Sequence, residues 1–208
     1  MTRRQGYRFR LKPTHADGMV LRRFVGCSRF VWNELLALNE LRSLCGERRL
    51  GYSAMCDYLT YLKDEYPFLR EVHSQPLQQT LKDLERAYGR AFDPSIRAGM
   101  PRFKKCGRPI GIRFPQGFKI DGGGVCVPKI GWIGFRKSRA IEGSPKNVSV
   151  SFEGRDWYVT IQTEREMPDM ACSVSAEVGI DLGVTRFAAL SDGTFVDGAS
   201  ALGTYERR

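Results

Sequence analysis

The sequence has no apolar run close to the roughly 20 residues that a membrane-spanning helix needs, and its charged N-terminus lacks the apolar segment of a secretory signal. These absences predict a cytoplasmic protein with no membrane partner. The six cysteines are widely spread and form no C-x-x-C pair, which excludes a zinc ribbon and a disulfide framework. The two histidines, His15 and His73, stand alone, and there is no G-x-x-x-x-G-K-[ST] loop. A histidine metal site, a Ser/Cys–His nucleophile and a P-loop nucleotidase are therefore not expected.

Positive charge is what the sequence does have, and it lies in two blocks. The 208 residues include 33 Lys and Arg against 23 Asp and Glu, a formal net charge of +10. Residues 1–29 carry a net charge of +7 and residues 97–139 a net charge of +10, whereas the remaining two segments are slightly acidic. A concentrated positive excess indicates a polyanionic partner, nucleic acid before membrane.

A helical region is predicted between the two basic blocks. Thr14, with Asp17 three residues later, is typical of a helix start, and apolar residues then recur at three- and four-residue steps. This pattern predicts one long helix, weakened near Gly26, followed by a second helix capped by Ser53 and a third opened by Ser74.

Strands are predicted on both sides of these helices. Residues 7–12 alternate apolar and basic side chains, which predicts a strand with one apolar and one fully cationic face. From about residue 100 the chain reads as short strands separated by Gly and Pro. Because an isolated strand needs partners, we expect the first strand to join the later ones. The predicted fold class is α+β: a small antiparallel β-barrel with a helical bundle inserted after its first strand, which brings both basic blocks together.

Near the C-terminus, an apolar strand holds one carboxylate, Asp181, between Gly179 and Gly183. Three interpretations fit. Asp181 is one of several carboxylates that hold two metal ions in an RNase H-like nuclease fold, or it belongs to the phosphate-binding hairpin of sugar-kinase, actin and chaperone-type ATPases, or it only caps or turns the strand. The following Asp192–Gly193 pair predicts a hairpin turn.

A set of short motifs in a specific order covers nearly the whole length of the chain. They are residues 7–13 (YRFRLKP), 27–33 (CSRFVWN), 77–79 (LQQ), 87–88 (AY), 91–92 (AF), 100–105 (MPRFKK), 114–120 (FPQGFKI), 127–132 (VPKIGW), 157–159 (WYV), 179–183 (GIDLG) and 191–193 (SDG). By these motifs the chain resembles the TnpB (OrfB) proteins of bacterial insertion sequences, which are relatives of the type V CRISPR effectors.

This resemblance implies an RNA-guided DNA endonuclease of the RuvC type, with guide RNA and target DNA as partners. It implies a wedge barrel from residues 1–13 and 96–164, a helical recognition domain from 14–95, a linker at 165–176, and the first hairpin of an RNase H-like (RuvC) domain at 177–208. Asp181 matches the first catalytic, metal-binding carboxylate of RuvC.

The sequence departs from the family pattern after Asp181. Family members need a Glu and a second Asp from later segments, with a four-cysteine zinc motif between them, and this chain has 27 residues after Asp181 and no C-x-x-C. Because a two-metal site cannot be built on one carboxylate, we expect Mg²⁺ or Mn²⁺ only in a complete site and no DNA cleavage by this chain alone. Only a second fragment carrying the rest of the nuclease domain could restore the site. The alternatives are a binding-only, RNA-guided transcriptional regulator and the ATPase-type hairpin.

The candidate nucleic-acid contacts are basic residues interleaved with aromatic ones, which offer nucleobases a stacking surface. The alternative is that these basic residues form a solvated surface that aids solubility. Arg29 and Asn33 lie one helical turn apart and either face a phosphate and a base or pair with each other or cap the bundle. The full set of candidates is Arg8, Arg10, Lys12, Arg29, Asn33, Arg102, Lys104, Lys105, Arg108, Arg113, Lys119 and Lys129.

Overall fold

The structure is a computed structural model that describes residues 2–107, 111–167, 177–183 and 186–197. The chain divides into two compact units, Met1–Met167 and Pro168–Arg208, which are described separately. Among the described residues, no helix has the length and apolar character needed to cross a membrane.

The first strand, β1 (Thr2–Lys12), shows the alternation that the sequence predicts. Its apolar side chains at positions 7, 9 and 11 are buried, whereas the basic side chains at positions 8, 10 and 12 are exposed. Residues 2–10 pair with β7 (Asp156–Glu166), and Leu11 and Lys12 pair with β5 (Gly131–Phe135). The first strand therefore joins the later strands, as expected.

The first unit is built on a seven-stranded antiparallel sheet in the order β2-β6-β7-β1-β5-β4-β3. The four strands not yet located are β2 (Ile112–Phe114), β3 (Lys119–Asp121), β4 (Gly124–Val127) and β6 (Ser144–Glu153). The α+β class is thus confirmed. Within the described residues, the edge strands β2 and β3 do not pair with each other, so the sheet is not a closed barrel.

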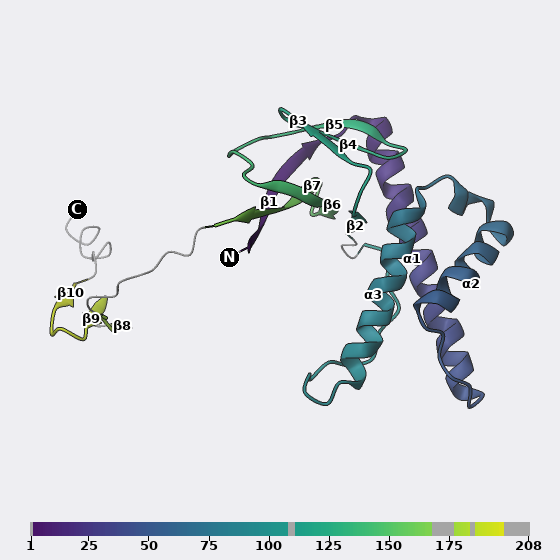
Figure 1. Cartoon of the computed structure of the whole chain (residues 1–208), viewed down its shortest axis with the longest axis horizontal. Coiled ribbons are helices and arrows are strands. Elements are labelled where there is room, and N and C mark those ends of the chain that lie inside the picture. Colours follow the sequence, from purple (N-terminus) through teal and green to yellow (C-terminus); the bar gives the residue numbers. More distant parts are fainter. Residues whose placement is uncertain (1, 108–110, 168–176, 184–185, 198–208) are drawn as a thin grey trace, which may run out of the picture. The chain divides into compact units, whose positions relative to one another are not determined.

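Three α-helices lie between β1 and β2 in the chain (Figure 1). They are α1 (His15–Leu44), α2 (Tyr52–Glu65) and α3 (Ser74–Phe92), with a 3₁₀ turn, η1 (Pro67–Arg70), between the last two. The predicted capping box is present: the Asp17 backbone N–H donates to the Thr14 hydroxyl at 3.2 Å, and the Thr14 N–H donates to the Asp17 carboxylate at 2.9 Å. Helix α1 is continuous through Gly26, and Gly51 rather than Ser53 is the N-cap of α2.

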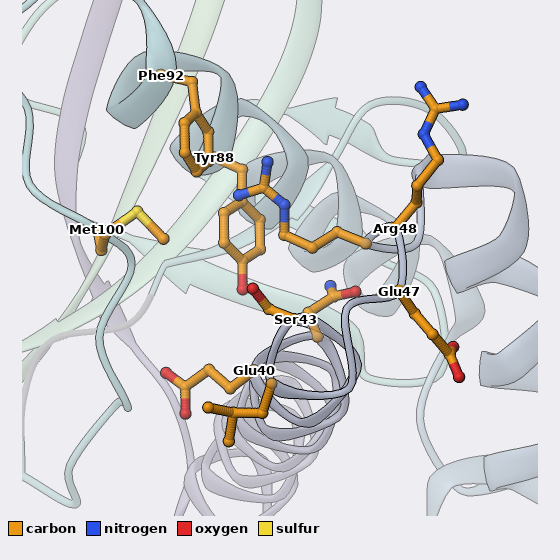
Figure 2. Close-up of a pocket in the computed structure, with 10 residues that line it drawn as sticks. Glu40, Ser43, Glu47, Arg48, Tyr88, Phe92 and Met100 are labelled. Atoms are coloured by element: carbon orange, nitrogen blue, oxygen red, sulfur yellow. The ribbon is translucent and has the colours of Figure 1, made fainter.

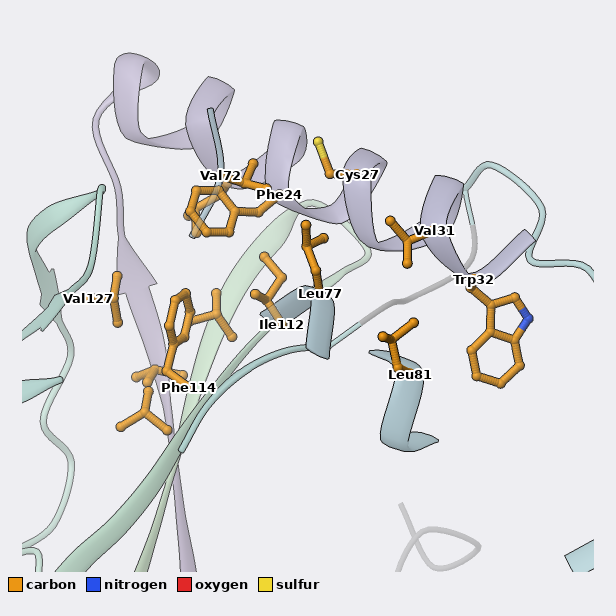
Figure 3. Packing of buried hydrophobic residues seen from close by; sticks show 14 of the residues in the cluster. Phe24, Cys27, Val31, Trp32, Val72, Leu77, Leu81, Ile112, Phe114 and Val127 are labelled. Carbon is orange, nitrogen blue, oxygen red and sulfur yellow. The ribbon is translucent and has the colours of Figure 1, made fainter. Parts of the chain in front are cut away.

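One hydrophobic core joins the helices to the sheet in the first unit. Figure 3 shows Phe24 of α1 near Val72, on the side of the helix where Leu77 of α3 and Phe114 of β2 lie. The rings of Phe24 and Phe114 lie 6.0 Å apart, and Phe114 is fully buried. The helical insertion is therefore packed onto the sheet rather than tethered to it.

The second unit contains a three-stranded antiparallel sheet in the order β10-β9-β8, formed by β8 (Ile180–Leu182), β9 (Ala188–Leu190) and β10 (Phe195–Val196). The predicted Asp–Gly turn joins β9 to β10: Gly193 has a φ of +87°, which glycine adopts at no steric cost, and the Thr194 N–H donates to the Asp192 carboxylate at 2.8 Å.

Candidate nucleic-acid interface

The cationic face of β1 is partly neutralised by the neighbouring β6–β7 hairpin. Arg8 pairs with Glu153 at 2.6 Å and stacks over the Tyr158 ring, 4.2 Å from its centroid. Arg10 pairs with Asp156 at 2.6 Å. Both ion pairs are solvent-exposed and so contribute little to stability, which leaves the guanidinium groups free to exchange a carboxylate for a phosphate.

A basic cavity of about 450 Å³ opens beside the end of β1. Its walls include the cationic side chains of Arg10, Lys12, Arg136 and Arg155, with Asp156 as the one acidic side chain. Strand pairing assembles it, because the β1–β5 register brings residue 136 beside residue 10, where the Arg136 N–H donates to the Arg10 carbonyl at 2.8 Å. Among the described residues, neither the Lys12 ammonium nor the guanidinium groups of Arg136 and Arg155 have a hydrogen-bond or ion-pair partner.

The basic segment at residues 100–105 is held against α1. The Trp32 indole N–H donates to the Arg102 carbonyl at 3.0 Å. The Asn33 amide donates to the Lys104 carbonyl at 3.2 Å and accepts from the Lys104 N–H at 2.8 Å. The Asn33 side chain is therefore engaged with the backbone of residue 104, which is neither a pair with Arg29 nor a cap of the bundle, and the Lys105 and Arg102 side chains remain exposed.

Lys104 itself is tied into this clamp. Its ammonium lies 3.7 Å from the centroid of the Trp32 ring, a cation–π contact. Burial lowers the pKa of Lys104, and the nearby Asp83 carboxylate partly opposes that shift. Lys104 is thus a less available phosphate ligand than its neighbours.

The other predicted contacts divide into engaged and free cations. The Lys129 ammonium donates to the carbonyls of Arg70 at 2.6 Å and Val72 at 3.2 Å, which ties the β4–β5 turn to the segment before α3. Arg113 lies 3.6 Å from Asp83. Lys119 is exposed and Arg29 half-buried, and neither side chain has a hydrogen-bond or ion-pair partner within the described part of the chain. The predicted contact Arg108 lies outside the described residues.

A larger cavity, of about 880 Å³, lies between the C-terminal ends of α1 and α3 (Figure 2). The Arg49 guanidinium stacks there on the rings of Phe92, at 3.8 Å, and Tyr88, at 4.8 Å. Glu40 and Glu47 line the same hollow, and burial together with Glu40 raises the pKa of Tyr88. Its mixed charge makes it a weaker polyanion site than the cavity beside β1.

Asp181 lies on β8 in the second unit, with its Cα opposite Ala189, and it is exposed. No group of three or more His, Cys, Asp or Glu side chains suitable for a metal ion occurs among the described residues. One carboxylate does not make a two-metal site, so the described donors do not fit the metal pair that a nuclease would need.

Comparison with known proteins identifies relatives along nearly the whole chain. A family named HTH_OrfB_IS605 and described as a helix-turn-helix domain matches residues 1–42. A protein of Escherichia coli (strain K12) named "Putative RNA-guided DNA endonuclease InsQ" is 42% identical over 198 residues, which cover 93% of this chain and 49% of that protein. Both findings agree with the resemblance of this chain to the TnpB (OrfB) proteins. A Streptomyces pristinaespiralis protein named "Putative RNA-guided DNA endonuclease" is 34% identical over 200 residues, covering 91% of this chain and 48% of its own length.

The chain spans about half the length of the curated relatives that it matches. The segment matched as a helix-turn-helix domain contains β1 and nearly all of α1, that is, one strand and one helix in this structure. The family motif at residues 27–33 supplies the Trp32 and Asn33 clamp.

Sequence reasoning missed two members of the basic cavity, Arg136 and Arg155. Arg136 lies in the second basic block, next to a predicted strand, and pairing that strand with the first one could have found it. Arg155 lies in the Gly–Arg–Asp turn between β6 and β7, and no sequence pattern links that turn to β1.

Proposed function

We propose that this chain forms the guide-RNA- and target-DNA-binding part of a TnpB-type, RNA-guided DNA endonuclease. The observation that carries the proposal is the basic cavity beside β1, where three cations without partners among the described residues converge with Arg10. Backbone phosphates are the ligands that such a site favours, because polyanion binding is dominated by cation–phosphate contacts. The names of both relatives, which describe RNA-guided DNA endonucleases, support the same partners.

The seven-stranded sheet then serves as the wedge domain, built from residues 1–13 and 96–164, and the helices of residues 14–95 as the inserted recognition domain. Residues 165–176 act as the linker, and residues 177–208 begin the RuvC domain. Exposed apolar side chains of the β8–β10 sheet support the assignment to a RuvC domain. Ile180 is 65% exposed and Leu182 is 69% exposed. An exposed apolar sheet of this kind is typical of a structure that other elements cover.

The phosphate contacts that we propose are the predicted residues with available cations, together with the two that the structure adds. Arg8 and Arg10 join them by exchanging their carboxylate partners for phosphates, whereas Asn33, Lys104, Arg113 and Lys129 act through the fold that they hold. The proposed set is Arg8, Arg10, Lys12, Arg29, Arg102, Lys105, Lys119, Arg136 and Arg155.

Asp181 is proposed as the first RuvC carboxylate, and the metal would be Mg²⁺ or Mn²⁺ in a complete site. Because the described donors do not fit that site, no catalytic step is assigned to this chain. Both relatives are named as endonucleases, which does not favour the binding-only regulator.

Salt titration of RNA binding tests the proposal. The double variant Arg136→Gln/Arg155→Gln is compared with Arg48→Gln/Arg90→Gln, which removes the same charge from two exposed positions, one in the connection between α1 and α2 and one in α3. With a labelled RNA stem–loop bearing a single-stranded tail, we expect the first variant to flatten the slope of log K against log salt by about 1.5, since each phosphate contact contributes about 0.7 to 0.9. Equal slopes for the two variants, or no salt dependence in the wild type, would refute it.

A further inference from the structure

A small apolar pocket of about 290 Å³ lies between α1 and the β6–β7 hairpin. Phe152 and Trp157 line it from the hairpin, with their ring centroids 5.0 Å apart, and Val25 and Gly26 line it from α1. Its volume is at the lower end of the range for small-molecule sites, which suits one planar ring system.

Gly26 is an unusual residue for this position, because glycine in a helix interior is less favourable than alanine. Neither of the usual reasons for a glycine applies. Its φ is not positive, and a Cβ built at residue 26 would meet no other atom within 4 Å. The lack of a side chain keeps one wall of the pocket open, and that is the effect of Gly26 that the structure shows.

Two arginines without acidic partners flank the pocket. Arg22 and Arg29 lie seven residues apart on the same face of α1 and both contribute to its lining. Within the described residues, the Arg22 guanidinium contacts only the Phe152 ring, 5.9 Å from its centroid, and the Arg29 side chain has no hydrogen bond or ion pair. An aromatic surface with cations at its rim complements a nucleobase joined to phosphates.

Trp157 connects this pocket to the basic cavity, because it lines both. It is only 5% exposed, yet its indole N–H donates to no described residue. The indole N–H is not one of the fully buried side-chain atoms that lack a partner, so it is accessible to an acceptor from solvent or from a ligand.

We propose that this pocket, defined by Gly26, Phe152 and Trp157, binds one unpaired nucleobase of the RNA, with Arg22 and Arg29 on the adjoining phosphates. The inference rests on the proposed RNA binding and adds a specific site to it. Because Trp157 lines both cavities, an RNA strand that enters the basic cavity beside β1 would place its next nucleotide at Trp157. RNA with unpaired nucleotides is therefore the ligand that fits.

Filling the pocket tests this proposal. Gly26→Leu is compared with Gly89→Leu, an exposed glycine in α3 whose built Cβ also has nothing within 4 Å. Leucine is a better helix former than glycine, so both variants should melt at least as high as the wild type. With single-stranded RNA, we expect Gly26→Leu to bind about tenfold more weakly, the loss of one stacked base, whereas Gly89→Leu and binding to fully paired RNA stay unchanged.

Arg29→Gln provides a second route if Gly26→Leu perturbs folding, and it should weaken single-stranded RNA binding selectively. An RNA with an abasic site at the bound nucleotide has no base to stack in the pocket, so it should bind the wild type and Gly26→Leu with equal affinity. Equal affinities of Gly26→Leu and Gly89→Leu for single-stranded RNA would overturn the pocket alone. A wild type that shows no salt-dependent RNA binding would overturn both the pocket and the proposed function.

Discussion

Replacing Asn33 with alanine should release the basic segment at residues 100–105 from α1. The Asn33 amide makes two hydrogen bonds to the Lys104 backbone, at 2.8 and 3.2 Å, in a partly buried setting. Each such bond has a net value of about 1 kcal/mol, so their loss should favour local opening by about 2 kcal/mol. That free energy corresponds to roughly a 30-fold larger open population of the segment, since 1.4 kcal/mol is a factor of ten.

Limited trypsin digestion measures this opening directly, because the segment offers cleavage sites after Arg102, Lys104 and Lys105. Under conditions where opening is fast relative to cleavage, the cleavage rate should rise about 30-fold in Asn33→Ala, following the open population. Asn33→Asp keeps the acceptor for the Lys104 N–H and loses the donor, so its rate should be intermediate. Equal rates in wild type and Asn33→Ala would refute the clamp.

Three further outcomes are expected. Thr14→Ala should lower the free energy of unfolding by about 1 kcal/mol because it removes the capping box, and Thr14→Ser should retain most of it, as measured by urea denaturation. Phe114→Ala should cost about 3 to 5 kcal/mol by opening a cavity in the shared core, whereas a much smaller loss would contradict its full burial. Burial, Lys129 and Lys63 lower the pKa of His73, whose Nδ1 accepts the Gln75 N–H. Because the unfolded chain then takes up a proton more readily than the folded one, the contribution of neutral His73 to the free energy of unfolding should be complete above pH 6.5 and fall as the pH decreases below it. His73→Asn should lack that pH dependence in thermal melts.

Much of the local structure in both units follows from short-range sequence patterns. The alternation in β1, the capping box at Thr14 and the Asp–Gly turn before Thr194 each depend on residues a few positions apart, and the structure has all three. The insertion of helices after β1 follows from one global requirement, that a lone strand finds partners.

The basic cavity could be predicted only in part, because it depends on contacts between distant residues. Arg10 and Asp156 are 146 positions apart, and no periodicity links Arg155 to β1. The role of Asn33 depends equally on the path of residues 100–105 over α1, which short-range patterns do not specify. Charge density alone likewise does not distinguish Lys129, which holds two carbonyls, from the exposed Lys119.

The pairing of β1 also has a consequence for synthesis on the ribosome. Thr2 pairs with Glu166, so β1 emerges before its main partner β7 and waits for it until most of the first unit has been translated. At about 5 to 20 residues per second, that delay is on the order of 10 to 30 s. During it, a half-apolar strand edge is open to other chains, and the alternating arginines act as charged gatekeepers against aggregation. The positive charges of β1 thus protect the nascent chain before any phosphate reaches them.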